Sequence, residues 1–363
     1  MSNRVQFRLL VVRLGAMGDI LHALPAVTAL RKAHPAWHIG WAVEPRWRAL
    51  LTAEAGAPAG HRSIHRPLVD ALHLIPTKAW SKRPMTAETW HGIVGARREL
   101  KAADYDAVLD LQGSIRSAVL SRMTGCHRMI GDSQPWEGPA RFLYTERIET
   151  IGAHVIEKAM ELASDVAGDL LMPEQPWLPV DAAAEAWCDH VTPKSGGRPV
   201  VLLNPGAGWG AKCWPAERYG LVARELTKAG ARVMVNAGPG EDALAARVVA
   251  YSGGMAETIV CTLPQLIALT RRIALLVGGD TGPLHLACAL GKPVVGIYGP
   301  TDPHRNGPYG SEFRVLRSPV SVRDHSRKPD TEAGLLMIQP EAVLNAAWEV
   351  APITDAARSE GLQ

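Results

Sequence analysis

The 363-residue sequence contains only five cysteines, which are scattered along the chain with no two in a Cys-x-x-Cys spacing. An odd, dispersed set argues against a disulfide framework and against a structural zinc site, and it indicates a reducing compartment. No stretch approaches the roughly 18 uninterrupted apolar residues that a membrane-spanning helix needs. The short apolar run near the amino terminus lacks the small-residue cleavage site of a signal peptide, so we interpret it as a buried strand.

Recognition motifs for dinucleotides and nucleic acids are also missing. None of the three glycine-containing loops described below reads Gly-x-Gly-x-x-Gly, and no helix-turn-helix, zinc-finger or RNP pattern occurs. The charge is nevertheless uneven. Residues 1–100 hold 14 Lys and Arg against 6 Asp and Glu, whereas the remaining residues hold 25 against 30. A basic amino-terminal part indicates an acidic partner, although a solvated basic face is the commoner explanation.

What the chain does contain is a repeated alternation of apolar strands and helical patterns. Its length exceeds the size at which one core keeps growing, so two domains are expected. Strand followed by helix, many times over, is typical of a parallel sheet that helices cover on both faces. In the first half we expect strands at 7–14, 38–43, 71–75 and 107–111, and helices at 21–30, 87–102 and 113–123.

The second half shows the same alternation more clearly. We expect strands at 200–204, 232–236, 259–262, 274–277 and 294–298, and helices at 215–229, 241–251, 264–271 and 282–290. The proline-rich stretch 171–199, with a short helix at 182–190, is interpreted as the connection between the halves. The predicted domains are 1–175 and 176–338, followed by a helix and tail at 339–363 that could pack back on the first domain.

Two doubly wound, Rossmann-like domains that face each other across a cleft would bind ligands at the carboxyl ends of their strands. The loop after the first strand ends in Asp19, close to a helix start. An N-cap aspartate explains such a position, and spacing alone favours that role. A carboxylate there could also act as a general base toward an acceptor hydroxyl. His22, one turn later, is either a ligand contact or a polar residue of the helix surface.

Two loops of the second half carry candidate ligand contacts. The loop 204–215 places three glycines beside Lys212, directly before a helix. This arrangement suits a diphosphate, because the lysine would neutralise the charge of a leaving group. A flexible surface loop with an exposed lysine explains it equally well. Glu241, at another helix start, could accept hydrogen bonds from the ribose hydroxyls of a nucleotide, and helix capping is the equal alternative.

The loop 278–285 is the most informative. It follows a buried strand and opens a helix, so the N–H groups of Thr281 and Gly282 form an anion site that the helix dipole assists. Asp280 or Thr281 can instead cap the helix, and His285 can be a structural histidine. Because glycines, an acid and a histidine gather at one strand end, we favour a ligand site.

Two other features carry less weight. Asp104-Tyr105-Asp106 is formally a metal-binding triplet, but it lies at the amino end of its strand, so we interpret it as turn chemistry. No cluster of His, Cys, Asp and Glu elsewhere has metal-ligand spacing. The stretch 78–101 combines six Lys and Arg with Trp80 and Trp90. It suits an anionic, membrane-embedded acceptor, although a solvated helix face is commoner.

Several motifs together resemble one known family. They are Met17-Gly18-Asp19 with Leu21-His22-Ala23-Leu24-Pro25, Tyr105-Asp106-Ala107-Val108, Asp110-Leu111-Gln112-Gly113 with Ser117-Ala118, Lys212-Cys213-Trp214-Pro215, Asp280-Thr281-Gly282-Pro283-Leu284-His285 and Tyr298-Gly299-Pro300-Thr301-Asp302-Pro303. These motifs, spread over roughly residues 8–310, resemble the ADP-heptose:lipopolysaccharide heptosyltransferases, glycosyltransferase family 9, and are closest to the heptosyltransferase I type. One departure is that Ala207 and Gly208 stand where the family has threonines.

The resemblance implies the GT-B fold, with the acceptor bound by the first domain and ADP-heptose by the second. It implies an inverting, metal-independent single displacement that needs no cofactor, with the ADP-sugar as a substrate. Asp19 then becomes the general base. The implied donor-binding residues are Lys212, Glu241 or its neighbour Asp242, Asp280, Thr281, Gly282 and His285. The predicted acceptor-binding residues are Gly18, His22, Trp80, Lys82, Arg83 and Arg116.

The implied acceptor is a Kdo-bearing lipid A at the inner leaflet. The protein is therefore expected in the cytoplasm, with peripheral contact to the inner face of the inner membrane and no nucleic-acid partner, and its oligomeric state stays open. One alternative is another family 9 enzyme, of the heptosyltransferase II type or with a different donor or acceptor. A second is an NAD(P) oxidoreductase, which the missing glycine motif disfavours. A third is a non-catalytic nucleotide-sugar-binding protein, which would not depend on Asp19.

Overall fold

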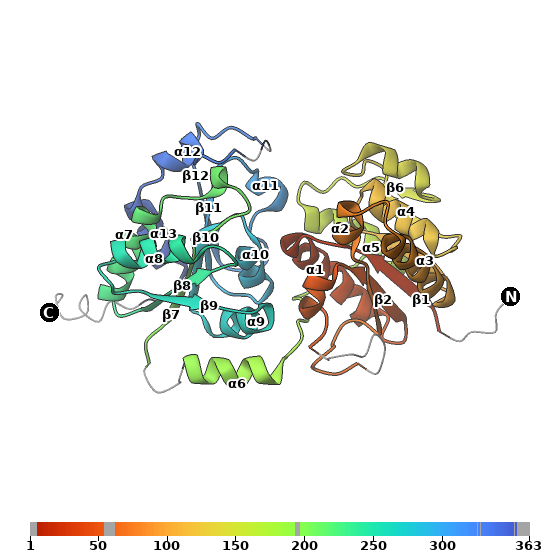
Figure 1. Cartoon of the computed structure of the whole chain (residues 1–363), viewed down its shortest axis with the longest axis horizontal. Coiled ribbons are helices and arrows are strands. Elements are labelled where there is room, and N and C mark those ends of the chain that lie inside the picture. Colours follow the sequence, from red (N-terminus) through yellow and green to blue (C-terminus); the bar gives the residue numbers. More distant parts are fainter. Residues whose placement is uncertain are drawn as a thin grey trace. The chain divides into compact units, whose positions relative to one another are not determined.

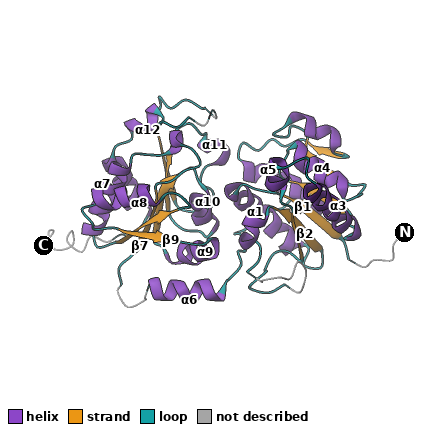
Figure 2. Ribbon diagram, in the orientation of Figure 1, coloured by secondary structure: helices purple, strands orange, loops and turns teal. Residues whose placement is uncertain are grey.

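The computed structural model describes residues 6–53, 62–192, 197–324, 326, 328–351 and 353. The chain divides into two compact units, Met1–Asp181 and Ala182–Gln363, and each contains one six-stranded sheet (Figure 1). Helices lie on both sides of each sheet (Figure 2), as expected of doubly wound domains. The predicted domain boundary lies slightly before the division between the units, and linker residues 193–196 fall outside the described part.

The sheet of the first unit consists of parallel strands. Their bounds are β1 Arg8–Val12, β2 His38–Val43, β3 Ala71–Leu74, β4 Ala107–Asp110, β5 Met129–Asp132 and β6 Glu146–Ile148. The strand order is β3-β2-β1-β4-β5-β6, so β1 pairs with both β2 and β4. Central residues such as Leu9, Val11 and Leu109 are fully buried, because helices cover both faces of a parallel sheet.

Helices connect these strands, and hydroxyl groups fix where two of them begin. The bounds are α1 Met17–Ala33, η1 Pro45–Leu50, α2 Thr77–Lys82, α3 Ala87–Ala102, α4 Ile115–Met123, η2 Gly138–Leu143 and α5 Val155–Ala167. The Thr86 hydroxyl accepts from the Thr89 N–H at the start of α3, and Ser114 caps α4 in the same way. Helix α1 packs along α5 on one face of the sheet.

The sheet of the second unit repeats this arrangement. The bounds are β7 Val200–Asn204, β8 Arg232–Ala237, β9 Glu257–Val260, β10 Leu275–Gly279, β11 Val294–Tyr298 and β12 Phe313–Arg317. The strand order is β12-β11-β10-β7-β8-β9. Counted from the first strand of its own unit, each sheet therefore has the order 3-2-1-4-5-6 that Rossmann-like domains share.

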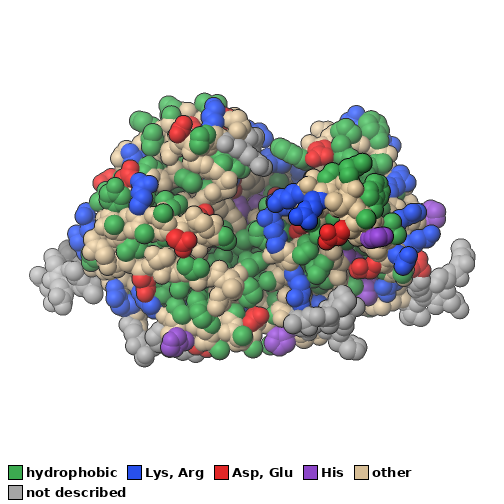
Figure 3. Space-filling view, viewed as in Figure 1, with side chains coloured by type: hydrophobic (Ala, Val, Ile, Leu, Met, Phe, Trp, Pro, Cys, Tyr) green, Lys and Arg blue, Asp and Glu red, His purple; other side chains and the backbone are tan. Residues whose placement is uncertain are grey.

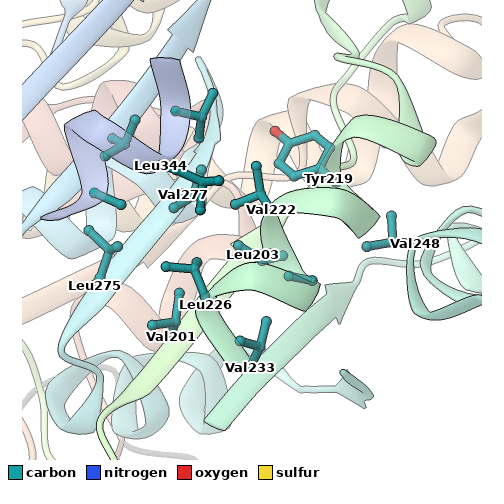
Figure 4. Packing of buried hydrophobic residues seen from close by; sticks show 14 of the residues in the cluster. Val201, Leu203, Tyr219, Val222, Leu226, Val233, Val248, Leu275, Val277 and Leu344 are labelled. Carbon is teal, nitrogen blue, oxygen red and sulfur yellow. The ribbon is translucent and has the colours of Figure 1, made fainter. Parts of the chain in front are cut away.

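The helices of the second unit include α7, α8 and α13, which contribute to one large hydrophobic core. Their bounds are α6 Ala182–Val191, η3 Gly210–Lys212, α7 Ala216–Lys228, α8 Asp242–Tyr251, α9 Leu263–Arg272, α10 Gly282–Ala289, α11 Pro303–Asn306, α12 Ala333–Met337 and α13 Pro340–Val350. Figure 4 shows Leu226, Val277 and Leu344, from α7, β10 and α13, turned toward the same interior. Within the described ranges, none of the helices combines the length and apolarity that crossing a bilayer requires.

Helix α13 corrects one expectation. The sequence analysis suggested that this helix and the tail after it pack back on the first domain. The helix packs against α7, β11 and β12 of the second unit, whereas tail residues 354–363 lie outside the described part. Its residues Val343 and Ala347 are fully buried in the second core. The apolar face of this helix is therefore satisfied within its own unit.

Candidate functional site

Each sheet has one point where the strand order reverses, between β1 and β4 in the first unit and between β7 and β10 in the second. Doubly wound sheets bind ligands beside the carboxyl ends of the strands at such a point. Asp19 follows β1, Lys212 follows β7, and Asp280 follows β10. Each of the three predicted loops therefore lies at the reversal point of its own sheet.

Asp280 is the centre of a buried polar cluster in the second unit. Lys212 Nζ lies 2.6 Å from its Oδ2 and 2.8 Å from its main-chain oxygen. His285 Nε2 lies 3.0 Å from Oδ1, and Asn306 Nδ2 lies 3.3 Å from the same atom. The structure thus joins three predicted donor-site residues with Asn306, which the sequence analysis did not identify.

The charges and hydrogen bonds of this cluster determine that the Asp280 carboxyl is ionised. Burial alone would raise the pKa of Asp280, but the hydrogen bond from His285 and the charge of Lys212 hold that pKa below its ordinary value. The carboxylate is therefore ionised at neutral pH, and His285 carries a proton on the Nε2 that faces it. Lys212 Nζ also lies 4.6 Å from the centre of the Trp209 ring. Because an ammonium has three donors, the third N–H of Lys212 can reach an incoming anion.

Thr281 and Gly282 form the amino-terminal end of α10. Thr281 Oγ1 accepts from Asn204 Nδ2 at 3.2 Å, and Asn204 Oδ1 accepts from Asn236 Nδ2 at 2.8 Å. These two bonds connect the carboxyl ends of β7, β8 and β10. The positive end of the α10 dipole lies at the same edge, which is a favourable place for phosphate. An asparagine at the end of an apolar strand was the signal that could have identified Asn204 and Asn236.

Glu241 lies beside the loop that follows β7. Its Oε2 accepts from the Gly238 N–H at 2.9 Å. A Cβ on Gly206 would lie 2.1 Å from the Glu241 carboxylate, so the absence of a side chain at Gly206 leaves room for this carboxylate against the loop. Asp242, the other residue considered for a ribose contact, is the exposed first residue of α8. Of the two acids, only Glu241 has its carboxylate against the glycine loop.

In the first unit, Asp19 is both a helix residue and an accessible carboxylate. Its Oδ2 accepts from the N–H of Ala16 at 2.8 Å. Ala16 is the N-cap residue of α1, so Asp19 caps the helix from its third position and is not the N-cap residue that the spacing favoured. Its Oδ1 lies 3.0 Å from Arg13 Nη2. The Asp19 side chain is 46% exposed, whereas that of Arg13 is 11% exposed. The carboxylate is therefore oriented by two contacts and still open to a ligand.

The two other residues predicted around Asp19 have different surroundings. Gly18 is partly exposed in the first turn of α1, immediately before Asp19. His22 is buried, and its ring packs edge-on against that of His154 in front of α5. The structure thus places Gly18 at the surface beside Asp19, whereas His22 belongs to the packing between α1 and α5.

The remaining predicted acceptor residues lie on α2, within the basic stretch 78–101, and on α4, outside it. Trp80 is half-buried, with its ring over Gly92, and it packs against the core of the first unit. Lys82 and Arg83 are exposed at the end of α2. Arg116 Nη1 lies 3.3 Å from Thr77 Oγ1, so this arginine reaches the loop that follows β3.

Glu44, which the sequence analysis missed, holds several of these loops together. It is buried directly after β2, and its Oε1 accepts from Thr77 Oγ1 at 2.5 Å and from the Lys78 N–H at 2.8 Å. Its own N–H donates to Leu14 O at 3.1 Å. The carboxyl ends of β1, β2 and β3 are therefore joined, and Arg116 extends this polar set. A glutamate directly after an apolar strand was the available signal.

Among the residues that the structure describes, no group of three or more His, Cys, Asp and Glu is placed to hold a metal ion. The Asp104-Tyr105-Asp106 triplet lies at the amino edge of the sheet, as predicted. Asp106 Oδ2 accepts from the Arg8 N–H at 2.7 Å, and Asp104 has the positive φ of 48° typical of a tight turn.

Comparisons with known proteins identify the family to which this chain is similar. Residues 93–335 match the family model described as glycosyltransferase family 9 (heptosyltransferase). Lipopolysaccharide heptosyltransferase 1 of Escherichia coli strain K12 is 31% identical over 319 residues, which cover 86% of this chain and 94% of the relative.

Two solved structures show the same similarity. E. coli heptosyltransferase WaaC with ADP has a TM-score of 0.76 and 26% identity, covering 95% of this chain and 100% of that chain. The same protein with ADP-2-deoxy-2-fluoro heptose has a TM-score of 0.73 and 26% identity over the same shares. The predicted α/β fold of the GT-B type, with two doubly wound domains, is confirmed.

Proposed function

Because this chain belongs to glycosyltransferase family 9, we propose that it transfers heptose from ADP-L-glycero-D-manno-heptose to a Kdo hydroxyl of the lipopolysaccharide inner core. The family membership makes the chain a glycosyltransferase, and it confirms the resemblance found in the sequence. The observation that carries the finer proposal is the cluster of Lys212, Asp280 and His285 beside the α10 amino terminus. It offers the charge and the N–H groups that a nucleotide diphosphate requires.

Residues of the second unit would make the contacts with the donor. The Lys212 ammonium and the N–H groups of Thr281 and Gly282 would bind the diphosphate of ADP. Asp280 and His285 keep Lys212 in place, because the buried carboxylate accepts from both. Glu241 would accept from the ribose hydroxyls, since its carboxylate lies beside Gly206. Backbone N–H groups near Ala207 and Gly208 would replace the contacts that threonine side chains make in the family.

The chemical step requires Asp19 and the anomeric carbon of the donor to meet in the reactive complex. Asp19 takes the proton of the acceptor hydroxyl, whose oxygen attacks the anomeric carbon from the face opposite ADP. The bond to the β-phosphate breaks with inversion, and Lys212 together with the α10 amino terminus stabilises the departing ADP. No step needs a metal ion or a cofactor, so transfer should continue in the presence of EDTA.

The acceptor contacts come from the first unit. Gly18, Lys82, Arg83 and Arg116 would meet the anionic Kdo and lipid A headgroup. Arg116 is favoured by its contact with Thr77 at the carboxyl edge of the sheet. Trp80, which lies over Gly92, would support these residues, and His22, one turn after Asp19 on α1, would complete the acceptor set. The proposed place of action is the cytoplasmic face of the inner membrane, where such an acceptor is embedded.

The proposal is tested by incubating the purified protein with ADP-heptose and Kdo-lipid A, following ADP release and the mass of the product. We expect one heptose to be added, and the anomeric configuration of the product should be inverted when examined by NMR. Acceptor that already carries a heptose is the control. Transfer only to that heptosylated acceptor would indicate an enzyme of the heptosyltransferase II type. Donor binding without transfer to any acceptor would contradict the enzymatic proposal.

A further inference from the structure

The outer side of α4 and η2 exposes apolar side chains that the proposed reaction does not use. Trp136 is 64% exposed and Phe142 is 67% exposed, while Ile115 and Val119 are 43% and 47% exposed. Exposed aromatic residues of this size usually mark an interaction surface. We define the α4–η2 surface as Ile115, Arg116, Val119, Arg122, Trp136, Arg141 and Phe142.

The structure holds these residues on one rigid part of the first unit. Ala118, Ala140 and Tyr144 form a buried cluster between α4 and η2. The Tyr144 hydroxyl donates to Asp110 Oδ2 at 2.9 Å, which fixes the chain after η2 to the end of β4. The exposed apolar residues are thus presented by packed elements.

The placement along α4 brings apolar and basic side chains together. Ile115, Val119 and Arg122 follow one another at spacings of four and three, so they share one face of the helix. Beside α4, the loop into η2 adds Trp136, and Glu137 of that loop accepts from the Ile115 N–H at 2.8 Å. Two segments distant in sequence therefore contribute to one surface.

The charge of this surface is positive. Arg116, Arg122 and Arg141 are exposed, and the guanidinium carbon of Arg141 lies 4.9 Å from the centre of the Phe142 ring. Within residues 113–143, all of which are described, Glu137 is the exposed carboxylate, and it is already bound to the backbone of α4. Figure 3 shows hydrophobic and basic side chains over the outer part of the first unit, with some acidic and histidine side chains among them.

We propose that the α4–η2 surface docks the protein on an anionic phospholipid bilayer. Trp136 and Phe142 would enter the interfacial region, where aromatic rings are stable, while the arginines meet the lipid phosphates. Each basic residue near such a membrane strengthens binding about fivefold. Because Arg116 also reaches Thr77, docking would bring a lipid-anchored acceptor to the carboxyl edge of the sheet. That last consequence rests on the proposed function.

The test is co-sedimentation of the full chain with vesicles of phosphatidylcholine alone and of phosphatidylcholine mixed with phosphatidylglycerol. We expect binding to the anionic vesicles, weakened by salt. Trp136→Ser combined with Phe142→Ser should lower the partition coefficient roughly tenfold or more. Arg122→Glu combined with Arg141→Glu should lower it by more than about tenfold.

Matched substitutions on the second unit are the controls. Val260→Ser with Met337→Ser changes two apolar residues that are each 63% exposed, and Arg247→Glu changes an arginine whose side chain is 62% exposed. These variants should bind vesicles as the parent does. All variants should keep the parental unfolding temperature and the parental rate of transfer to a water-soluble Kdo acceptor.

Loss of vesicle binding in the α4–η2 variants alone, with transfer to the soluble acceptor unchanged, supports the proposal. Equal binding to neutral and anionic vesicles, or binding that the substitutions leave intact, overturns it. If the same substitutions abolish self-association in analytical ultracentrifugation and leave vesicle binding intact, the surface is a protein interface and the proposal is wrong. Surface-dependent vesicle binding by a protein that transfers heptose to no acceptor would support docking and count against the proposed function.

Discussion

At the scale of single residues, Asp19 has two roles that substitution can separate. Its Oδ2 accepts the Ala16 N–H at the start of α1, and its exposed carboxylate is the proposed base. An asparagine keeps an acceptor oxygen of similar position but cannot take a proton. An alanine removes both functions, so the two variants distinguish stability from catalysis.

We expect Asp19→Asn to lower kcat by about 10²- to 10⁴-fold, because a general base contributes that much. Asp19→Ala should lose as much activity and should also lose about 1 kcal/mol of unfolding free energy through the missing cap. Both variants should bind ADP as the parent does. Steady-state kinetics, urea unfolding and calorimetric titration with ADP measure the three quantities. Parental turnover in either variant would refute the assignment of the base.

The lowered pKa of Asp280 predicts how the free energy of unfolding changes with pH. The pKa of this carboxyl in the folded protein lies below the ordinary 3.8. Its contribution to stability is therefore complete well above pH 3.8 and is lost as the pH falls through the folded pKa. Asp280→Asn leaves Lys212 without its buried counter-charge, and we expect a loss of about 3 kcal/mol at pH 7.

The measurement is urea unfolding of the parent and of Asp280→Asn from pH 7 down to pH 3. The stability gap between the two proteins should stay constant down to about pH 5 and then narrow. By pH 3 it should have narrowed by about 1 kcal/mol, because each pH unit below the unfolded pKa removes up to about 1.4 kcal/mol. A gap that is unchanged between pH 5 and pH 3 would mean that folding does not lower the pKa of Asp280.

At the scale of elements, the loop between β7 and α7 depends on one close contact. A Cβ on Gly210 would lie 1.5 Å from the carbonyl oxygen of Pro329. In the same loop, the Ala211 N–H donates a hydrogen bond to Lys328 O at 3.0 Å. The segment around residues 328–332 therefore supports the loop that carries Lys212.

Gly210→Ala should push this loop away from its support, destabilise the second unit by about 1–3 kcal/mol, and weaken ADP binding. Gly208→Ala is the matched control, because a Cβ at that position has open space around it. Gly208→Ala should leave the stability of the second unit and its affinity for ADP close to the parental values. Thermal unfolding with and without ADP measures them. Equal behaviour of the two variants would show that the loop does not need its contact with Pro329.

The strongly patterned elements could be predicted from the sequence almost to the residue. The bounds of β2, α3, β7 and β11 agree with the expected ones. The predicted strand at 259–262 was displaced, since β9 runs from Glu257 to Val260, and β5, β6 and β12 were not identified. The last two lie at sheet edges. An edge strand has one partner and a more exposed face, so its sequence carries no continuous apolar run.

Some residues of the candidate site could likewise be predicted from the sequence, and others could not. Lys212, Asp280, Thr281 and His285 could be predicted to converge, because each follows the end of a buried strand. Asn306 could not, since it acts through Asp280, a partner far along the chain. The place of Glu44 directly after an apolar strand was a signal, but its contact with Thr77 could not be foreseen. Such contacts depend on side-chain packing that no local pattern encodes. The burial of His22 could not be foreseen for the same reason, because only the fold reveals that α5 packs along α1.

At the scale of the whole molecule, the two units should respond separately to their ligands. We expect ADP to slow amide hydrogen exchange in the loops 204–213, 238–241 and 279–285 of the second unit. Saturating ADP at about 100 times its Kd should add about 2.7 kcal/mol to the stability of the state that binds it. The loop around Asp19 should show little change with ADP alone. Mass spectrometry of exchanged peptides tests this, and protection confined to the first unit would contradict the proposed division of substrates.

The burial of α13 has a consequence for how the protein is made in the cell. Domains generally fold in order as the nascent chain leaves the ribosome. The first unit can complete its core while the second is still being synthesised, because its elements end before residue 182. The second core, which includes Val343 and Ala347, stays open until α13 has emerged from the exit tunnel. A stop codon placed before residue 340 should therefore yield a chain with a folded front half and a back half that proteases degrade.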